Sequence, residues 1–234
     1  MKVILMSYTP EPEKKVAAAA RLCYSAAGPD ELLENLDEQQ VQKFLGKLVD
    51  LGHLSPTEHV TFTFGIEGVS RALSHQLVRH RVASYSQKSQ RYVNEGQFEF
   101  VTPPSIRRDT EALELYQAKM REIQAAYDQL SKIVPKEDAR YILPNACETK
   151  LVATFNTRSL YNFFQHRCCQ RAQWEIRELA QQMLAAVKEV APTLFAKAGA
   201  SCITQGVCPE GSMTCGLLDK IKAKAAQSKT GEGC

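Results

Sequence analysis

Apolar and polar positions follow two different periods along the first third of the chain. Residues 17–26 are rich in alanine and residues 39–51 repeat apolar side chains at helical spacing, so both segments are predicted to be helices. Residues 59–66 place an apolar side chain at every second position, which is typical of a half-buried strand. Residues 69–81 return to helical spacing, and we expect that helix to carry basic residues at its C-terminal end.

Polar residues dominate the next stretch before the helical pattern resumes. Residues 82–99 contain few large aliphatic side chains and are predicted to form an extended polar loop, with a short strand at residues 98–101. Residues 109–133 have a long amphipathic pattern, which predicts a helix with a structural role. A short helix at residues 136–143 and a strand at residues 151–155 are predicted to follow.

The last third of the chain is predominantly helical. Residues 156–169 indicate a transition from a strand to a helix, residues 173–190 predict another helix, and Pro192 opens a short final one. Residues 201–234 are rich in Gly, Ser, Lys and Cys and are predicted to be a loosely ordered tail. Helical blocks of unequal length between the strands favour an α+β fold, with a central, mostly antiparallel sheet flanked by long helices. We therefore expect one domain, residues 1–200, followed by the tail.

Composition describes an ordinary globular protein and narrows the kinds of ligand that it can bind. Of the 234 residues, 44% are hydrophobic and 24% are charged, and the net charge of +3 is too small to argue for nucleic-acid binding by bulk electrostatics. The arginines nevertheless gather in two groups, which suit a phosphorylated ligand better than a long polyanion. These groups are Arg79, Arg81 and Arg91, and Arg158, Arg167 and Arg171.

The sequence contains neither an apolar run long enough to span a membrane nor an N-terminal apolar stretch long enough for a signal peptide. We therefore expect a cytoplasmic protein whose eight cysteines are free thiols. Cys202, Cys208 and Cys215 are separated by six and seven positions, outside the usual zinc pattern, so no metal is expected.

Common motifs for nucleotide binding and for cysteine catalysis are absent. The chain has no glycine-rich dinucleotide fingerprint and no P-loop, so any nucleotide would be bound by side chains. Cys147, Cys168 and Cys169 are candidate nucleophiles, but their spacing reveals no histidine and asparagine or aspartate that would activate them. Small buried side chains are the simpler interpretation of these cysteines.

The most informative stretch is RHRVASYSQKSQRY, residues 79–92. Two arginines flank a histidine, and small hydroxyl groups and Arg91 follow, a combination of donors that suits phosphate oxygens. Taken alone, this stretch is equally well interpreted as a solvated basic helix end that the helix dipole stabilises.

A second group of polar side chains lies on the helix predicted after the last strand. Arg158 and Asn162 are four positions apart and so share one helical face. Arg167 projects from near the apolar stripe, where an unpaired charge is costly, so its guanidinium requires an anion or a carbonyl oxygen. The alternatives are an ion pair with Glu175 or Glu178, or a side chain that extends its charged end to solvent.

Together these residues resemble the flavin-dependent thymidylate synthases. The family signature is Arg-His-Arg, seven or eight residues and then Ser, and here Arg79-His80-Arg81 is followed by seven residues and Ser89. The other matching features are His53 with S-P-T-E-H at residues 55–59, Arg140 in D-A-R-Y-I-L-P, N-T-R-S-L-Y-N-F at residues 156–163, and Arg167 with Q-W-E at residues 173–175. For the segment around His53, a capped turn before a strand is the alternative.

The resemblance implies an activity, an assembly and a set of ligands. It implies an α+β enzyme that methylates dUMP to dTMP, with methylenetetrahydrofolate as carbon donor and NADPH-reduced FAD as hydride source. It also implies a homotetramer whose active sites draw residues from several subunits. By resemblance, the FAD-binding residues are Ser55, Arg79, His80, Arg81, Gln87, Asn156, Thr157, Arg158 and Asn162, with His53 near the flavin or the folate. By resemblance, the dUMP-binding residues are Gln76, Leu77, Val78, Arg79, Gln87, Lys88, Ser89, Gln90, Arg91, Arg140 and Arg167.

We assign the catalytic role to Arg167. A guanidinium beside the uracil ring would favour the ionised ring and raise the nucleophilicity of C5. Ser89 has no obvious general base near it, so we assign it to substrate binding. Position 87 is Gln where some members of the family have Glu, so a carboxylate role is not transferred to it. A nucleic-acid-binding module that uses the arginine clusters, and a scaffold without catalysis, are the alternative functions.

Overall fold

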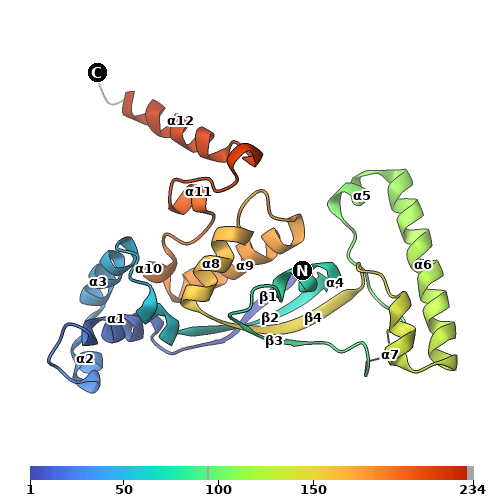
Figure 1. The fold of residues 1–234 in the computed structure, drawn as a ribbon, viewed down its shortest axis with the longest axis horizontal. Coiled ribbons are helices and arrows are strands. Elements are labelled where there is room, and N and C mark those ends of the chain that lie inside the picture. Colours follow the sequence, from blue (N-terminus) through green and yellow to red (C-terminus); the bar gives the residue numbers. More distant parts are fainter. Residues whose placement is uncertain (94, 231–234) are drawn as a thin grey trace. The chain divides into compact units, whose positions relative to one another are not determined.

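The computed structural model describes residues 1–93 and 95–230 of the chain, with side chains up to residue 223. Within these residues, four strands form one antiparallel sheet in the order β1-β2-β4-β3 (Figure 1). The strands are β1 (Lys2–Tyr8), β2 (Thr61–Ser70), β3 (Ser84–Gln87) and β4 (Glu148–Asn156). A contact of 2.9 Å between the hydroxyl oxygens of Thr63 and Thr154 marks the register of β2 against β4. The predicted α+β class with a central antiparallel sheet is confirmed.

The chain divides into two compact units, and β1, β2 and β4 each contribute residues to both. The first unit consists of Met1–Val3 and Gly65–Ala153, and the second of Ile4–Phe64 and Thr154–Cys234. In the described part of the chain, none of the helices combines the length and the apolar character that crossing a membrane requires.

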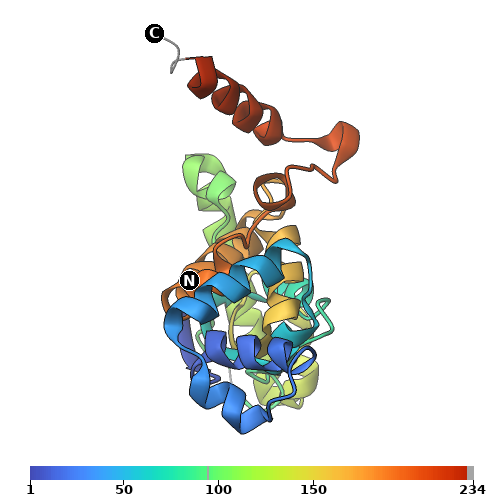
Figure 2. The ribbon, with the colours of Figure 1, turned by 90° about the vertical axis from the view of Figure 1, so that its left-hand side faces the viewer.

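Helices make up most of the second unit. Helix α1 (Pro12–Leu22) packs against both α2 (Pro29–Asn35) and α3 (Glu38–Asp50). These three helices face the viewer in Figure 2. Helix α8 (Thr157–Arg167) packs against α9 (Trp174–Val190) and against the 3₁₀ helix η1 (Ser55–His59). The remaining elements of this unit are α10 (Pro192–Phe195), α11 (Ser201–Thr204), the 3₁₀ helix η3 (Gly211–Met213) and α12 (Leu217–Thr230).

An aromatic core stabilises the second unit. Phe62 and Phe64 from β2, Phe155 from β4 and Phe164 from α8 are almost completely buried. The ring of Phe62 meets that of Phe195 edge-on, with 5.4 Å between centroids, and the rings of Phe64 and Phe155 are 6.4 Å apart. Aromatic side chains of this size contribute a large part of the apolar area that folding buries. The core therefore fixes α8, and with it the polar residues at both of its ends.

In the first unit, β2 leads directly into the short helix α4 (Arg71–Leu77). Gly68 has a φ of 70°, and a Cβ at this position would lie 3.2 Å from the Cα of Met1, so the backbone here requires glycine. The side chain of Ser70 then accepts a hydrogen bond of 3.0 Å from the amide of Leu73 and caps α4.

The rest of the first unit is built around one long helix. Its elements are α5 (Pro104–Arg108), α6 (Thr110–Ile133), α7 (Lys136–Ala139) and the 3₁₀ helix η2 (Arg140–Ile142). Phe98, Met120 and Cys147 form a small buried cluster, against which Phe100 and Tyr116 pack. This cluster connects α6 to the segment that follows β3 and to the start of β4.

Several predicted elements are confirmed with small changes in their bounds. The strands predicted at residues 59–66 and 151–155 correspond to β2 and β4, which are both longer. The helices predicted at residues 39–51, 109–133 and 173–190 are α3, α6 and α9.

Other predictions about the elements were wrong. The helix predicted at residues 69–81 is the shorter α4. It begins only at Arg71 because β2 continues through Ser70, and it ends at Leu77 because the Arg-His-Arg segment forms a turn. The loop predicted at residues 82–99 contains the edge strand β3, and residues 98–101 form only an isolated bridge, Phe100 to Cys147. The predicted loose tail contains α11 and α12, while residues 231–234 lie outside the described residues. The helix predicted at residues 17–26 is α1, which begins earlier and ends at Leu22, and β1 and α2 were not predicted.

Candidate active site

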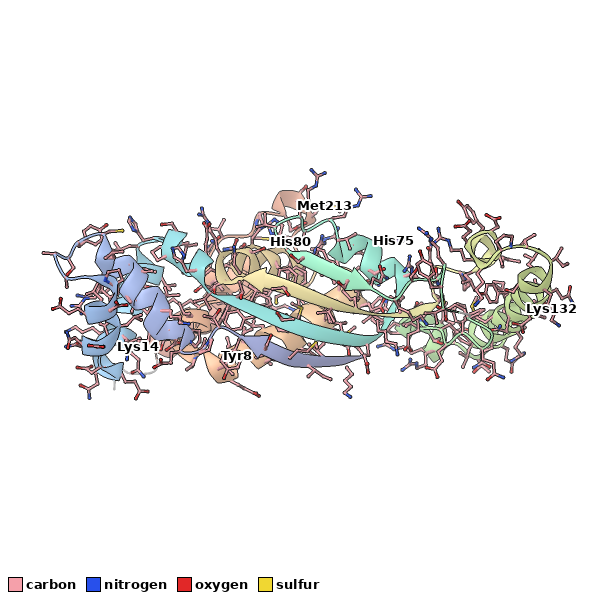
Figure 3. The ribbon with its side chains drawn as sticks, turned by 90° about the horizontal axis from the view of Figure 1, so that it is seen from below. Tyr8, Lys14, His75, His80, Lys132 and Met213 are labelled. Atoms are coloured by element: carbon pink, nitrogen blue, oxygen red, sulfur yellow. The ribbon has the colours of Figure 1, made fainter. Side chains whose placement is uncertain are left out.

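The Arg-His-Arg tripeptide forms a turn after α4 that Tyr85 of β3 holds in place. The hydroxyl oxygen of Tyr85 lies 3.0 Å from the carbonyl oxygen of Leu77 and 2.8 Å from that of His80, so its proton bonds to this turn. Burial raises the pKa of Tyr85, which keeps the hydroxyl protonated as a donor. The side chain of His80, labelled in Figure 3, is half-buried, whereas those of Arg79 and Arg81 are exposed. The two guanidinium groups are therefore accessible to an anion.

Gln76, Leu77 and Val78, predicted to contact the substrate, lie at the end of α4. Leu77 is fully buried, so its side chain belongs to the core. Val78 is exposed and Gln76 is half-buried. The amide of Gln76 is therefore the polar side chain that this group offers to a ligand.

Gln87 at the end of β3 is matched to two hydroxyl groups. Its Nε2 donates to the Oγ of Ser74 at 3.0 Å and to the Oγ1 of Thr149 at 3.1 Å. The hydroxyl of Ser74 in turn donates to the carbonyl oxygen of Arg71 at 2.9 Å. An ionised glutamate has no proton to donate, and the proton of Ser74 is already engaged, so glutamine fits these surroundings better.

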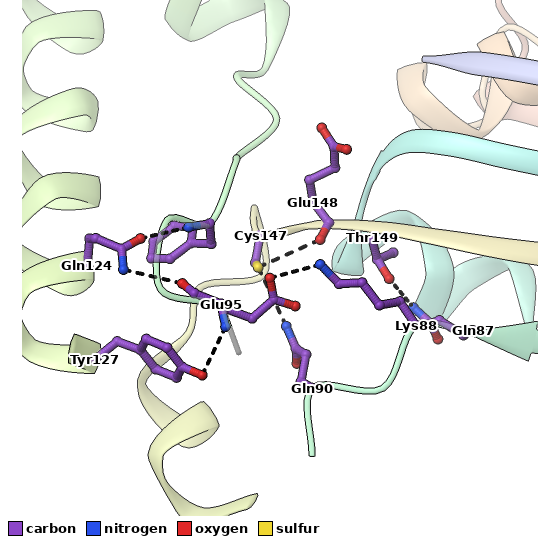
Figure 4. A network of polar contacts seen from close by, with 10 residues as sticks. Gln87, Lys88, Gln90, Glu95, Gln124, Tyr127, Cys147, Glu148 and Thr149 are labelled. Carbon is purple, nitrogen blue, oxygen red and sulfur yellow. Dashed lines mark hydrogen bonds and ion pairs between the residues drawn. The ribbon is translucent and has the colours of Figure 1, made fainter. Parts of the chain in front are cut away.

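Residues 88 and 90 direct their side chains inward, between β4 and α6 (Figure 4). The ammonium of Lys88 lies 2.8 Å from a carboxylate oxygen of Glu95, which is 5% exposed. The Nε2 of Gln90, itself buried, donates to the sulfur of Cys147 at 3.5 Å. These two side chains, predicted as substrate contacts, thus have partners within the protein.

Arg91 and Arg140 are brought to the same residue, Glu137. The Nε of Arg91 is 3.8 Å from a carboxylate oxygen of Glu137, and the Nε of Arg140 donates to the carbonyl oxygen of Glu137 at 3.1 Å. The guanidinium of Arg91 also lies over the ring of Tyr92, 5.2 Å from its centroid. The hydroxyl of Ser89 accepts from the amide of Arg91 at 3.2 Å. Arg91 and Arg140 are thus linked through Glu137, and Ser89 is linked to Arg91.

In the second unit, the first residues of α8 are engaged in holding the helix. The Oδ1 of Asn156 accepts a hydrogen bond of 2.8 Å from the amide of Ser159 and caps the helix. Thr157 is fully buried, and its amide donates to the carbonyl oxygen of Val60 at 2.9 Å. The side chains of Asn156 and Thr157, both predicted to bind FAD, therefore have structural roles.

The other predicted FAD residues of this unit are exposed. Arg158 and Asn162 lie on the exposed face of α8, as their spacing predicted. The guanidinium of Arg158 pairs with the carboxylate of Glu58 in η1, and this ion pair is about half-exposed. His53 and Ser55, just before and within η1, are exposed as well. These side chains are accessible to a large polar ligand.

Arg167 is the last residue of α8 and is half-buried. Its guanidinium makes no hydrogen bond and no ion pair within residues 1–93 and 95–223, so neither Glu175 nor Glu178 is its partner there. Leu160, Phe163 and Phe164 of the same helix are buried, as predicted. A guanidinium beside such an apolar surface is stabilised by an anion or a carbonyl oxygen.

Two of the cysteines, Cys147 and Cys168, lie in environments that do not activate their thiols. Burial raises the pKa of Cys147 and of Cys168 to about 11, so both are protonated at neutral pH. For Cys147, which is fully buried, the interpretation as a small core side chain is confirmed. Four other cysteines line one pocket of about 70 Å³ in the second unit: Cys169, Cys202, Cys208 and Cys215.

Sequence reasoning missed three acidic residues of these groups, namely Glu58, Glu95 and Glu137. Glu58 lies inside the matched S-P-T-E-H block, which was the available signal. Glu137 is three positions before Arg140, and this spacing on a helical turn was a weaker signal. No sequence pattern distinguishes the buried Glu95 from the exposed Glu99 four positions later.

Comparison with known proteins agrees with these features. Residues 4–193 match the family model described as "Thymidylate synthase complementing protein". The flavin-dependent thymidylate synthase of Clostridium tetani is 52% identical, over 95% of this chain and 96% of its own length. That of Geobacter sulfurreducens is 54% identical, over 95% of this chain and 97% of its own length.

Solved structures give the same result. The flavin-dependent thymidylate synthase of Helicobacter pylori, crystallised with FAD and dUMP, matches with a TM-score of 0.65 and 26% sequence identity. The match covers 85% of this chain and 100% of the Helicobacter chain. With the family model matching most of the chain and relatives more than 50% identical, the chain belongs to the family of flavin-dependent thymidylate synthases.

Proposed function

We propose that the chain methylates dUMP to dTMP, taking the carbon from methylenetetrahydrofolate and the hydride from FAD that NADPH has reduced. Family membership supports the reaction, and the Helicobacter structure with FAD and dUMP supports the two ligands. Within the chain, the observation that carries the proposal is the half-buried guanidinium of Arg167, which has no partner among the described residues.

Arg167 is the residue that we propose to polarise the uracil ring. The ring offers carbonyl oxygens, which accept hydrogen bonds from a guanidinium, and an N–H whose ionised form a positive charge attracts. A positive charge beside them favours the ionised ring and raises electron density at C5, the carbon that is methylated. In this role Arg167 acts electrostatically and forms no covalent bond to the substrate.

For the dUMP phosphate we propose the group of Ser89, Arg91 and Arg140. A phosphate dianion is bound best by forked guanidinium donors and small hydroxyls, and Glu137 holds the two arginines near each other. Other proposed substrate contacts are Gln76, Leu77, Val78, Arg79, Gln87, Lys88 and Gln90. Of these, Leu77, Gln87, Lys88 and Gln90 have side chains that are buried or engaged, so they act through the backbone or by support.

For FAD we propose His53, Ser55, Arg79, His80, Arg81, Gln87, Asn156, Thr157, Arg158 and Asn162. The exposed arginines, the hydroxyl of Ser55 and the amide of Asn162 fit the pyrophosphate and the polar edge of a flavin. Asn156 and Thr157 contribute by fixing the start of α8, which presents Arg158 and Asn162. When bound, the reduced flavin supplies the hydride for the methylation.

The proposed FAD and dUMP residues come from both compact units of the chain. We propose that the chain forms a homotetramer whose active sites combine residues of several subunits. We also propose that the enzyme is located in the cytoplasm. Gel filtration with light scattering measures the assembly directly, and a monomeric active enzyme would contradict a shared site.

The visible absorption spectrum of the purified protein tests the proposal. We expect a bound flavin whose yellow colour is bleached by NADPH under anaerobic conditions. The variant Arg158→Ala is expected to retain less FAD, whereas Arg108→Ala, an exposed arginine on α5, is expected to retain as much as the parent. A parent protein that stays colourless after incubation with FAD would contradict the proposal.

A further inference from the structure

Glu95 is a buried acid that the proposed reaction does not use. Its side chain is 5% exposed, and one carboxylate oxygen lies 2.8 Å from the ammonium of Lys88. The other oxygen, Oε1, is buried and has no hydrogen-bond partner among the residues that the structure describes. A buried carboxylate is costly unless a charge compensates it, so the position of Lys88 is dictated by Glu95 (Figure 4).

Helix α6 fixes the backbone on both sides of Glu95. The hydroxyl of Tyr127 accepts from the amide of Glu95 at 3.2 Å, and the Nε2 of Gln124 donates to the carbonyl oxygen of Glu95 at 3.3 Å. The Oε1 of Gln124 also accepts from the amide of Phe98 at 2.8 Å. Gln124 and Tyr127 are three positions apart and so lie on one face of α6. Glu95 is therefore held by a rigid element, and Lys88 is the partner that adapts.

On its other side, the segment of Lys88 is aligned along β4. The amide of Lys88 donates to the carbonyl oxygen of Lys150 at 2.9 Å, Gln87 bonds to Thr149 of β4, and Gln90 bonds to Cys147, just before β4. Three side chains of this segment, those of residues 87, 88 and 90, are thereby held inside the protein. Ser89 and Arg91 have other partners: the hydroxyl of Ser89 accepts from the amide of Arg91, and the guanidinium of Arg91 lies beside Glu137.

Cys147 lies within this network without competing for the ion pair. Burial, and secondarily the negative charge of Glu95, raise the pKa of Cys147 to about 11. The thiol is therefore neutral at physiological pH, and it accepts a weak hydrogen bond from Gln90. Lys88 is left as the cation that compensates Glu95.

We propose that Glu95 is a positioning residue, which holds Lys88 inside the protein and so fixes the conformation of residues 88–91. Lys88 then acts as a tether and is not a ligand of the phosphate. The inference rests on the proposed function, because it assumes that Ser89 and Arg91 bind dUMP. It adds to that function a residue, Glu95, that acts on the substrate only through others.

The test compares two ion pairs of the same unit in the FAD-loaded protein. Glu95→Gln removes the charge from the buried pair, and Glu122→Gln removes it from the Lys119–Glu122 pair on α6, whose side chains are about 60% exposed. We expect Glu95→Gln to raise the dissociation constant of dUMP by about 10-fold or more, with kcat at saturating dUMP changed by less than about 3-fold. Glu122→Gln is expected to match the parent in both quantities.

Amide hydrogen exchange of the peptide containing residues 87–91 separates positioning from a general loss of stability. In Glu95→Gln we expect faster exchange in this peptide and unchanged exchange in α9, whereas equal acceleration in both would overturn the proposal. An unchanged dUMP affinity in Glu95→Gln would overturn it as well. If Glu95→Gln does not fold, the double variant Glu95→Gln/Lys88→Met, which leaves no unpaired charge, gives the same readouts.

The failure of this inference is distinguishable from that of the proposed function. A parent protein that binds no dUMP contradicts the proposed function. The exchange measurement on residues 87–91 does not require dUMP, so it still decides whether Glu95 holds this segment.

Discussion

Two arginines of α8 differ sharply in what surrounds them. Arg158 is exposed and pairs with Glu58, an arrangement that contributes about 0–1 kcal/mol to stability. Arg167 is half-buried and has no partner among the described residues. A ligand that offers carbonyl oxygens to Arg167 therefore gains more than one bound at Arg158, because it satisfies a charge that the fold leaves uncompensated.

Replacing Arg167 by alanine tests its proposed role at the uracil ring. We expect Arg167→Ala to lower kcat for dTMP formation by about 10²- to 10³-fold, the loss typical of one electrostatic donor in an active site. Flavin retention should remain close to that of the parent. Arg171→Ala, an exposed arginine four positions later, is the matched control and should keep its activity. Parent-like methylation by Arg167→Ala would exclude the polarising role.

The buried thiol of Cys147 makes a prediction about alkaline pH. Its pKa is about 11 in the folded protein and near 9 when exposed, so folding favours the protonated thiol. This contribution to stability is fully present below about pH 9 and is lost as the pH rises through about 11. We expect urea unfolding in the presence of reductant to show that the parent loses about 1–2 kcal/mol of its free energy of unfolding at alkaline pH. The variant Cys147→Ala should not show this loss. Cys23→Ala, at an exposed position, should lose as much as the parent.

Among the elements, the edge strand β3 joins the turn after α4 to the proposed substrate segment. Two side chains of β3 contact α4 and the turn that follows it: Tyr85 bonds to the turn, and Gln87 bonds to Ser74 of α4. Ser89 and Arg91 follow directly in the chain. A short strand thereby supports two proposed ligand sites, one for FAD and one for dUMP.

Removing the hydroxyl of Tyr85 tests this support. We expect Tyr85→Phe to lower the free energy of unfolding by about 1 kcal/mol, because the hydrogen bond to the turn is lost. The affinity for FAD should fall several-fold, since Arg79 and Arg81 flank the released turn. Tyr141→Phe, at a position that is 83% exposed, should change neither quantity. Chemical denaturation and flavin titration measure both effects, and an unchanged flavin affinity in Tyr85→Phe would show that β3 does not hold the turn.

The sequence predicted elements well where one face is apolar and poorly where burial is slight. The amphipathic helices α3, α6 and α9 were predicted because each repeats apolar side chains at helical spacing. Strand β3 was missed, because its four residues, SYSQ, alternate only between exposed and half-buried positions. Helix α12 was missed as well, because residues 201–234 were predicted to form a loosely ordered tail.

The candidate site was predictable as a set of residues but not as a set of contacts. Arginines and hydroxyls were identified from their types and spacing. The partners Glu137 and Glu95 come from segments that only the folded chain brings to Arg91 and Lys88. Burial of Glu95 depends on α6, which is distant in sequence, so periodicity alone could not reveal it.

At the scale of the whole molecule, the match to the family model stops before residues 194–234, here called the extension. The family model covers residues 4–193, whereas α11 and α12 lie beyond it. The relatives compared are flavin-dependent thymidylate synthases, and nothing in these comparisons supports the nucleic-acid-binding alternative. We expect the reaction to depend on the matched region.

Truncation after Gly216, which removes α12, tests that division. Helix α12 packs against α11. We therefore expect the Tm of the truncated protein to stay within about 3 °C of the parent, which corresponds to about 1 kcal/mol for a chain of this size. Methylation should stay within about 2-fold. Loss of flavin or a much larger fall in Tm would assign the extension a role in the fold or the site.

The formation of dTMP tests the central claim most directly. Purified protein is incubated with dUMP, FAD, NADPH and methylenetetrahydrofolate that is labelled at its one-carbon unit. The products are separated, and their masses are measured by mass spectrometry. We predict that labelled dTMP forms and that it is absent when any one of the four components is omitted. The reaction without FAD uses protein from which the bound flavin has been removed. Persistent absence of dTMP from a protein that binds both FAD and dUMP would contradict the claim.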